Sequence, residues 1–281
     1  MGEPATAGEA TTGRHSNLMI RVISAIVLVP IALGAAYVGG PFWLALACLA
    51  AIGLFWEWQY LVGGAQTSVL AAGVFVLVMI GAALNLHDIG MAVYCVPAAV
   101  LAIATFTVTE ARFWAPGGIA YAGSALIASV LVRLDRDVGF EALLFVFLMV
   151  WLTDILGYFA GRGIGGPKLW VRVSPNKTWA GAIAGVAGCV LCAAAFAVVD
   201  GRAMLSLIAL GALLSVVAQL GDLGESALKR QFGAKDSSQL VPGHGGLLDR
   251  LDGFVAAIVA AALIGALRSG TDAVGHGLLI W

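Results

Sequence analysis

The sequence predicts an all-α, polytopic integral membrane protein with about nine transmembrane helices. The chain of 281 residues is 61% hydrophobic and only 11% charged, whereas an ordinary soluble domain is about 25% charged. In water such a chain could not cover itself with polar surface, but in a bilayer lipid can face its apolar side chains. Polar residues are also unevenly distributed: they gather in two connecting segments of the C-terminal half.

The apolar segments define the spans. A helix that crosses the hydrocarbon core needs about 20 mostly apolar residues. The fifth segment gives the weakest signal because it is rich in Gly and Ala. The predicted spans are 19–38, 42–62, 68–86, 91–109, 115–132, 140–160, 178–199, 204–221 and 253–268.

Three regions follow from this pattern. Residues 1–18 are expected to form a disordered tail, because they are small and polar and lack the apolar core of a signal peptide. Residues 19–139 form the N-terminal transmembrane helices, and residues 140–281 form a C-terminal transmembrane region that carries the polar segments. The four cysteines lie inside apolar runs and are interpreted as packing residues.

Basic residues predict the orientation. The two long connections, 161–177 and 222–252, are separated by two spans and therefore lie on one side of the membrane. That side, with the N-terminus, carries 11 of the 15 Lys and Arg residues, and the other side carries four. The positive-inside rule places the N-terminus and both long connections in the cytoplasm. The eleven are Arg14, Arg21, Arg112, Arg162, Lys168, Arg172, Lys177, Lys229, Arg230, Lys235 and Arg250.

The first polar segment has features of a phosphate site. Glycines around Arg162 and before Lys168 can expose backbone N–H groups beside a cation. A P-loop is excluded, because Lys168 follows Pro167 and no Gly-Lys-Ser/Thr is present. Asp154, inside an apolar helix, should face protein or a polar cavity.

A helix start is expected directly after this glycine-rich stretch. Ser174 is predicted to cap a helix that begins near Pro175. Lys177 and Thr178 would then lie near a helix N-terminus, which favours anions. A flexible turn between two spans remains the alternative for the whole segment.

The second polar segment predicts a carboxylate cluster. If the eighth span continues to Gly233, its C-cap, then Asp222, Ser226 and Lys229 share one face. Asp249 and Asp252 share a face at the start of the ninth span. Carboxylates beside basic residues suit Mg²⁺ and polyphosphate. A solvated loop of balanced ion pairs is the alternative.

One acidic residue of the N-terminal half has a different interpretation. Glu57 lies in the run Trp56–Tyr60, which is typical of an aromatic belt at the membrane interface. We expect it to be an interfacial anchor, with a functional role as the alternative.

The second segment resembles the phosphatidate cytidylyltransferase (CDP-diglyceride synthase) family. The matching residues are Ser226, Lys229, Arg230, Lys235, Asp236, Pro242, Gly243, His244, Gly245, Gly246, Asp249, Arg250 and Asp252. The first segment is similar at Asp154, Tyr158, Gly161, Arg162, Lys168, Leu169, Ser174, Pro175, Lys177, Thr178 and Gly181. The chain departs from the family pattern at Ala180, where Glu is common, and at Gly224, where Phe is common.

The resemblance implies a reaction and a set of roles. The phosphate of phosphatidic acid would attack the α-phosphorus of CTP, giving CDP-diacylglycerol and pyrophosphate. The implied catalytic residues are Asp222, Asp249, Lys229, Arg230 and Ser226, with Asp222, Asp249 and Asp252 as metal ligands. The implied substrate-binding residues are Lys177, Ser174, Thr178, Arg162, Lys168, Lys235, His244 and Arg250. Mg²⁺ is the expected cofactor, and a second monovalent or divalent cation remains open.

Partners and alternatives follow from the same comparison. The expected partners are CTP, phosphatidic acid and membrane lipids, with a homodimer as a further expectation and no role for nucleic acid. A bacterial-type inner (plasma) membrane is the expected location, with the active site between the last helices on the cytoplasmic side. The alternatives are a cytidylyltransferase or kinase for an isoprenoid lipid, and a transporter. A transporter is disfavoured because its polar residues would lie near the midplane in paired repeats.

Overall fold

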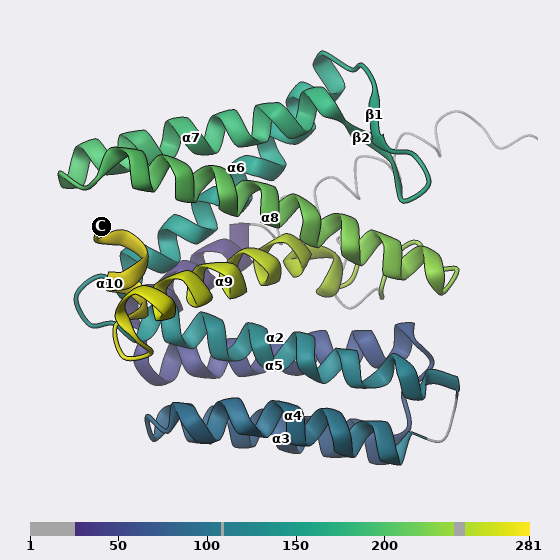
Figure 1. Ribbon diagram of the computed structural model, residues 1–281. Helices are drawn as coiled ribbons and strands as arrows, with labels where there is room; N and C mark the ends of the chain where they lie inside the picture. The colour runs from purple at the N-terminus through teal and green to yellow at the C-terminus, as the bar shows by residue number, and fades with distance from the viewer. Residues whose placement is uncertain (1–25, 108–109, 239–244) are drawn as a thin grey trace, which may run out of the picture.

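The protein is a bundle of long, roughly aligned helices with one short hairpin (Figure 1). The computed structural model describes residues 26–107, 110–238 and 245–281. Its elements are a helix over Ile26–Val38 followed by α2 (Gly40–Leu61), α3 (Thr67–Asn85), α4 (Ile89–Phe106), the 3₁₀ turn η1 (Glu110–Phe113), α5 (Ala115–Leu134), α6 (Gly139–Gly163), β1 (Lys168–Trp170), β2 (Ser174–Thr178), α7 (Trp179–Asp200), α8 (Met204–Gln231), α9 (Leu248–Ser269) and α10 (Val274–Leu279).

The predicted spans are largely confirmed. Within the described residues, eight helices are long and apolar enough to cross a membrane, and they coincide with the second to ninth predicted segments. The first segment, 19–38, is described only from residue 26, and its described part is helical. The tail 1–18 lies outside the described residues. The chain is an integral membrane protein of the all-α class.

Two helix boundaries differ from the sequence prediction, and one short helix was not predicted. α8 does not end at residue 221 but continues to Gln231, as the shared-face argument required, and Gly233 then has a φ of 68°. α9 begins five residues earlier than predicted, at Leu248. The short α10, which no hydropathy window predicts, packs against α9 and α6.

The predicted helix start at Ser174 is wrong. Ser174 to Thr178 form strand β2, which pairs antiparallel with β1 and joins Lys168 to Thr178. The helix begins at Trp179, and its capping side chain is Thr178, whose hydroxyl accepts a hydrogen bond from Gly181 N at 3.2 Å. The cap is therefore four residues later than Ser174, and Lys177 projects from a strand.

Close helix packing brings the walls of the polar region together. α6 packs against α7, α7 against α8, and α8 against α9. A Cβ on Gly181 of α7 would lie 2.6 Å from the Gly157 carbonyl oxygen of α6, so the two backbones meet where no side chain fits. α5 packs against α2, α4 and α9 and is largely enclosed by them.

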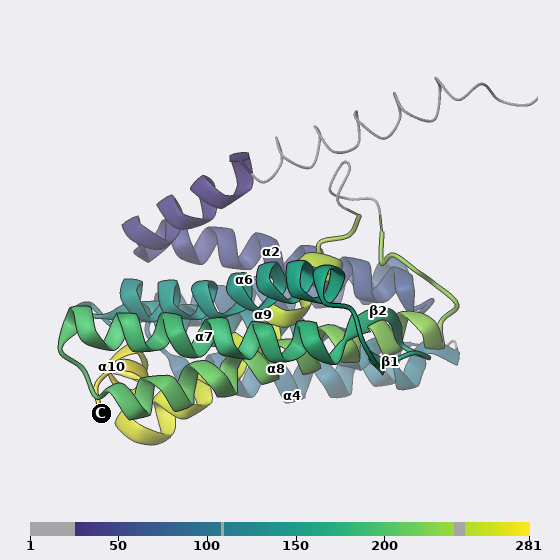
Figure 2. The ribbon, with the colours of Figure 1, turned by 90° about the horizontal axis from the view of Figure 1, so that it is seen from above.

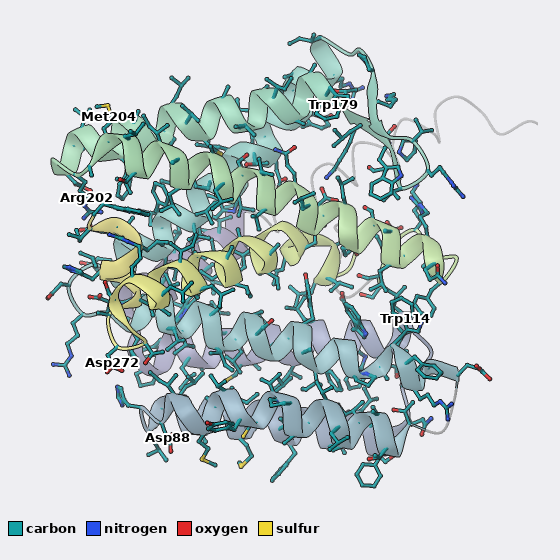
Figure 3. All side chains as sticks on the ribbon, in the orientation of Figure 1. Asp88, Trp114, Trp179, Arg202, Met204 and Asp272 are labelled. Carbon is teal, nitrogen blue, oxygen red and sulfur yellow. The ribbon has the colours of Figure 1, made fainter. Side chains whose placement is uncertain are left out.

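The two long polar segments lie at one end of the bundle. The hairpin and the last turns of α8 are at that end, whereas α10 and the C-terminus are at the other (Figure 1 and Figure 2). Figure 3 shows the same division through labelled side chains: Trp114 and Trp179 lie at the hairpin end, and Arg202 and Asp272 lie at the opposite end. The prediction that both connections share one side agrees with this arrangement.

Candidate active site

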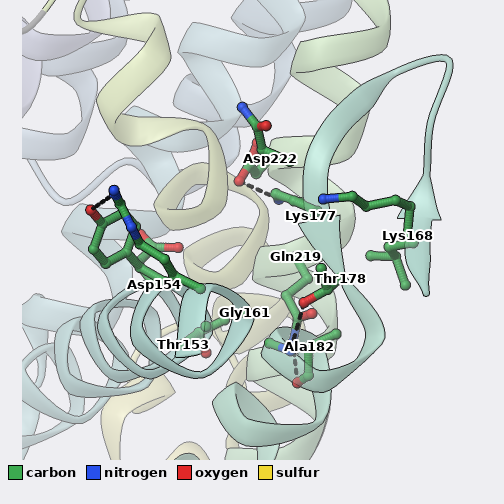
Figure 4. A pocket seen from close by; sticks show the side chains of 15 residues that line it. Thr153, Asp154, Gly161, Lys168, Lys177, Thr178, Ala182, Gln219 and Asp222 are labelled. Carbon is green, nitrogen blue, oxygen red and sulfur yellow. Dashed lines mark hydrogen bonds and ion pairs between the residues drawn. The ribbon is translucent and has the colours of Figure 1, made fainter. Parts of the chain in front are cut away.

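A polar cavity opens at the hairpin end of the bundle. Its volume is about 590 Å³, and residues from α6, the hairpin, α7 and α8 line it (Figure 4). Its charged lining residues are Asp154, Arg162, Lys168, Lys177 and Asp222, and its hydroxyl-bearing ones are Thr153, Tyr158 and Thr178. Five of these were predicted as site residues, and Asp154 was predicted to face a polar cavity. The hairpin contributes two lysines to the cavity lining, and α6 and α7 contribute glycines.

One ion pair crosses this cavity. Lys177 of β2 contacts the carboxylate of Asp222 of α8 (Figure 4). The two side chains are 27% and 29% exposed, so both remain accessible to a ligand. Ser226, one turn further along α8, donates a hydrogen bond to Asp222 Oδ1 at 3.4 Å. The predicted pairing of Asp222 with Ser226 on one helix face is therefore confirmed.

Three carboxylates from three helices lie within electrostatic range of one another. Asp154 of α6, Asp222 of α8 and Asp252 of α9 interact electrostatically with one another, and Lys177 and Arg250 act on Asp154. The Gly253 N–H donates to Asp252 Oδ1 at 2.7 Å. Like charges drawn from three helices repel unless cations compensate them. These three carboxylates therefore favour the binding of a cation.

Asp249 belongs to a second network. Its Oδ1 accepts a hydrogen bond from Lys229 Nζ at 2.7 Å, and its Oδ2 accepts from Ser237 N at 3.1 Å and Gly246 N at 3.0 Å. Lys229 Nζ also contacts Glu225 Oε2 at 2.7 Å. The side chains of Lys229, Glu225 and Asp249 are 11%, 4% and 9% exposed. Lys229 is therefore buried between two carboxylates.

The remaining predicted residues lie around the two networks. Arg162 is exposed and donates to the Tyr158 hydroxyl at 2.9 Å. Arg230 is exposed and donates to the Ala234 carbonyl at 3.0 Å. Lys235 and Arg250 are exposed, Ser174 is half-buried in β2, and His244 lies outside the described residues.

The described acidic, cysteine and histidine side chains do not form a metal site by themselves. Within residues 26–107, 110–238 and 245–281, no three His, Cys, Asp or Glu side chains converge closely enough to hold a metal ion alone. Asp252 interacts electrostatically with both Asp222 and Glu225, whereas Asp249 is hydrogen-bonded to Lys229. The shared metal site of these three aspartates remains a prediction.

A group of hydrogen-bonded side chains lies next to the cavity. Thr153 Oγ1 lies 2.7 Å from Ser215 Oγ and 3.2 Å from Cys189 Sγ, and Gln219 Nε2 lies 3.4 Å from Ser215 Oγ. Thr153 and Gln219 also line the cavity. Cys189 is fully buried and donates to the Met149 carbonyl, which fits its predicted packing role.

Sequence reasoning missed two acidic residues. Glu225 stands four residues before Lys229, a spacing that favours helical ion pairs and could have predicted the contact. Glu57 is 1% exposed and contacts the second polar segment, so its assignment as an interfacial anchor is wrong. A lone carboxylate in an apolar span is a functional signal by default, and that rule would have identified it.

The two departures from the family pattern lie at one exposed and one half-buried position. Gly224 is exposed, and a Cβ there would meet no described atom within 4 Å. Ala180 is half-buried beside the cap of α7.

The fold and site define a polytopic membrane protein with a polar cavity suited to anions. Comparison with known proteins agrees with this class and narrows it. Residues 19–267 match the Cytidylyltransferase family, and the chain therefore belongs to that family.

Its relatives match along most of their length. The chain is 42% identical to the phosphatidate cytidylyltransferase of Brucella abortus over 269 residues, which cover 92% of this chain and 96% of that protein. It is 36% identical to the phosphatidate cytidylyltransferase of Haemophilus influenzae (85% and 95% covered) and 37% identical to that of Pseudomonas aeruginosa (87% and 96% covered). The resemblance inferred from the motifs is confirmed.

Proposed function

We propose that the protein transfers a cytidylyl group from CTP to phosphatidic acid, forming CDP-diacylglycerol and pyrophosphate in phospholipid biosynthesis. An oxygen of the phosphatidate phosphate forms a bond to the α-phosphorus of CTP, and the bond from that phosphorus to the pyrophosphate oxygen breaks. The observation that carries the proposal is the match, over most of the chain, to relatives named phosphatidate cytidylyltransferase. The polar cavity at one end of the bundle supports it.

The cations of the cavity have the role of binding and orienting two anions. Arg162, Lys168 and Lys177 line it, and such groups are suited to phosphate oxygens. Because phosphoryl transfer depends mainly on positioning and charge neutralisation, these residues supply catalysis without a covalent intermediate. Lys177 contacts Asp222, and an incoming phosphate would compete with that carboxylate for the ammonium group.

The carboxylates around Asp222 fit a magnesium ion whose remaining ligands come from the substrate phosphates and water. Mg²⁺ is usually held by one or two carboxylates together with phosphate and water, which agrees with three carboxylates in electrostatic range that do not form a closed cage. Asp222 and Asp252 would hold it, and Asp249 is the further ligand expected from the resemblance. When bound, the ion neutralises charge on the leaving pyrophosphate. A second monovalent or divalent cation belongs to the same proposal.

The test of function is a lipid panel. Purified protein in detergent is incubated with radiolabelled CTP and Mg²⁺ plus phosphatidic acid, an isoprenyl phosphate or an isoprenoid alcohol. We expect label in lipid only with phosphatidic acid, release of pyrophosphate, and loss of turnover in excess EDTA that added Mg²⁺ restores. Turnover only with an isoprenoid acceptor would refute the substrate assignment, and full activity in EDTA would refute the metal.

The proposed orientation places the cavity in the cytoplasm, where CTP is found, and the protein in a bacterial-type inner membrane. In a variant without native cysteines, Asp236→Cys at the hairpin end and Asp272→Cys at the opposite end are both exposed positions. A membrane-impermeant thiol reagent should label intact cells only at position 272 and permeabilised cells at both. The reverse pattern would refute the orientation. The expected homodimer is tested separately by light scattering of the purified protein.

A further inference from the structure

A buried carboxylate from the N-terminal half contacts the second polar segment. Glu57 of α2 accepts hydrogen bonds from Ser238 Oγ at 2.6 Å and Leu247 N at 2.8 Å through Oε1. Its Oε2 accepts from Ser237 Oγ at 2.9 Å and Leu248 N at 2.7 Å. Glu57 is only 1% exposed. A buried carboxylate with both oxygens doubly satisfied is strongly held in one orientation.

Two of these donors are backbone N–H groups at the start of α9, which have no hydrogen-bond partner within the helix. The first N–H groups of a helix have no partner within it, and α9 has no capping side chain of its own at Leu247. The cap is instead the Glu57 carboxylate, 190 positions before Leu247 in the sequence. Its negative charge is also favourable at a helix N-terminus.

The surface of α2 is shaped for the same contact. Gly53, one turn before Glu57, lies under Leu247: a Cβ there would be 2.7 Å from Leu247 Cδ2. Gly246 is equally constrained, because its Cβ would lie 1.8 Å from Ser237 Oγ and 2.6 Å from Glu57 Oε2. Two glycines therefore allow the segment to approach Glu57 closely.

The segments that Glu57 holds are the ones that fix Asp249. Ser237 donates its hydroxyl to Glu57 and its backbone N–H to Asp249. Gly246, adjacent to the Glu57-bound Leu247, donates its N–H to Asp249 Oδ2. We propose that Glu57 is a positioning residue of the active site, which sets Asp249 by anchoring Ser237–Ser238 and Gly246–Leu248. The catalytic consequence rests on the proposed function, whereas the anchoring itself does not.

The sharpest variant is Glu57→Gln. A glutamine of the same size has one oxygen and one NH₂ group. Whichever way it is placed, the NH₂ faces either Leu247 N or Leu248 N, so one backbone donor loses its acceptor. Serine hydroxyls can rotate, but these amides cannot. Gln59→Leu is the matched control: it is also buried on α2, but its side chain bonds to the Ala115 carbonyl and not to the segment.

The experiment uses full-length protein in detergent with three readouts: thermal unfolding, steady-state kinetics, and hydrogen–deuterium exchange of peptides covering 245–250. Glu57→Gln should remain folded and inserted, exchange faster in that peptide, and lose about 10²-fold in kcat, the scale expected for about 1 Å of misplacement. KM for CTP should change much less. Glu57→Asp, which keeps the charge, should recover part of kcat, and Gln59→Leu should change neither exchange in 245–250 nor kcat.

The outcomes separate the two proposals. Wild-type kcat in Glu57→Gln, or a loss of kcat without faster exchange in 245–250, would overturn the positioning role. If Glu57→Gln fails to fold, Ser238→Ala must show the faster exchange, and unchanged exchange there refutes the anchor. Wild-type protein without turnover on CTP and phosphatidate would refute the proposed function, while the exchange comparison would still decide whether Glu57 holds the two segments.

Discussion

Lys229 offers a direct test of the buried charge network. Its ammonium group lies 2.7 Å from both Glu225 and Asp249, and the three side chains are at most 11% exposed. The substitution Lys229→Met keeps the aliphatic length and removes the charge, leaving two carboxylates close together without a cation. Removing one partner of a buried ion pair costs about 3–5 kcal/mol. We therefore expect Lys229→Met to lose stability as well as activity.

The magnitude can be measured by thermal unfolding in detergent. At about 2 °C per kcal/mol, the low end for chains of 150–250 residues, the loss corresponds to roughly 6–10 °C. Adding Glu225→Gln to Lys229→Met removes one of the uncompensated charges and should recover part of the lost stability. The coupling free energy between the two substitutions should be about 0.5–3 kcal/mol. Because the pair is buried, salt should change the result little. An unfolding temperature for Lys229→Met within a degree of wild type would refute this account.

Three further perturbations test other parts of the site. Arg230→Ala should change the free energy of unfolding by no more than about 0.5 kcal/mol, because the side chain is exposed, but it should lower turnover of CTP. Arg230→Lys should also lose activity if the contact to phosphate is bidentate. Wild-type kinetics in both variants would exclude a phosphate contact. Asp222→Asn, Asp249→Asn and the double variant should be about equally inactive in a Mg²⁺ titration, and near-normal turnover of either single variant would contradict a shared metal. Gly181→Val should destabilise the protein by about 1–3 kcal/mol, because its Cβ would lie 2.6 Å from the Gly157 carbonyl oxygen; an unchanged unfolding temperature would show that α6 and α7 can separate without cost.

The spans were predictable because one physical requirement dominates them. Each of the second to ninth segments must present about 20 apolar residues to the bilayer, and hydropathy measures that directly. Helix ends follow other rules. Six of the last ten residues of α8 are polar, so hydropathy does not predict this part of the helix, but the shared face of Asp222, Ser226 and Lys229 and the C-capping Gly233 do.

The hairpin shows where local signals mislead. Ser174 followed by Pro175 has the composition of a helix start, yet these residues pair with β1. Thr178 has the same capping chemistry and lies next to the apolar run, where its hydroxyl reaches Gly181 N. The cap lies four residues after the predicted one, because residues 174–178 pair across the hairpin, which is a non-local interaction.

The partners of each charge were the least predictable part of the site. The sequence groups Lys229 with Asp222 on one helix face, but the structure pairs it with Glu225 and Asp249, while Asp222 meets Lys177 from the hairpin. Ion pairs between distant segments depend on how helices are rotated against one another, which periodicity does not fix. The residues of the site could be recognised from their motifs; their division into two networks could not.

The enclosure of α5 has a consequence for how this chain tolerates mutation. In the span Glu110–Leu134, 78% of the apolar window is buried within the protein, against 17% for α4. At α4, lipid accepts almost any apolar side chain, so substitutions there should be filtered by polarity and hardly by size. At α5, neighbouring helices leave little room, so small-to-large changes should be rejected even when they raise hydropathy. A deep mutational scan would then show opposite signatures in two adjacent helices: polarity would limit the substitutions tolerated in α4, and side-chain volume would limit those tolerated in α5.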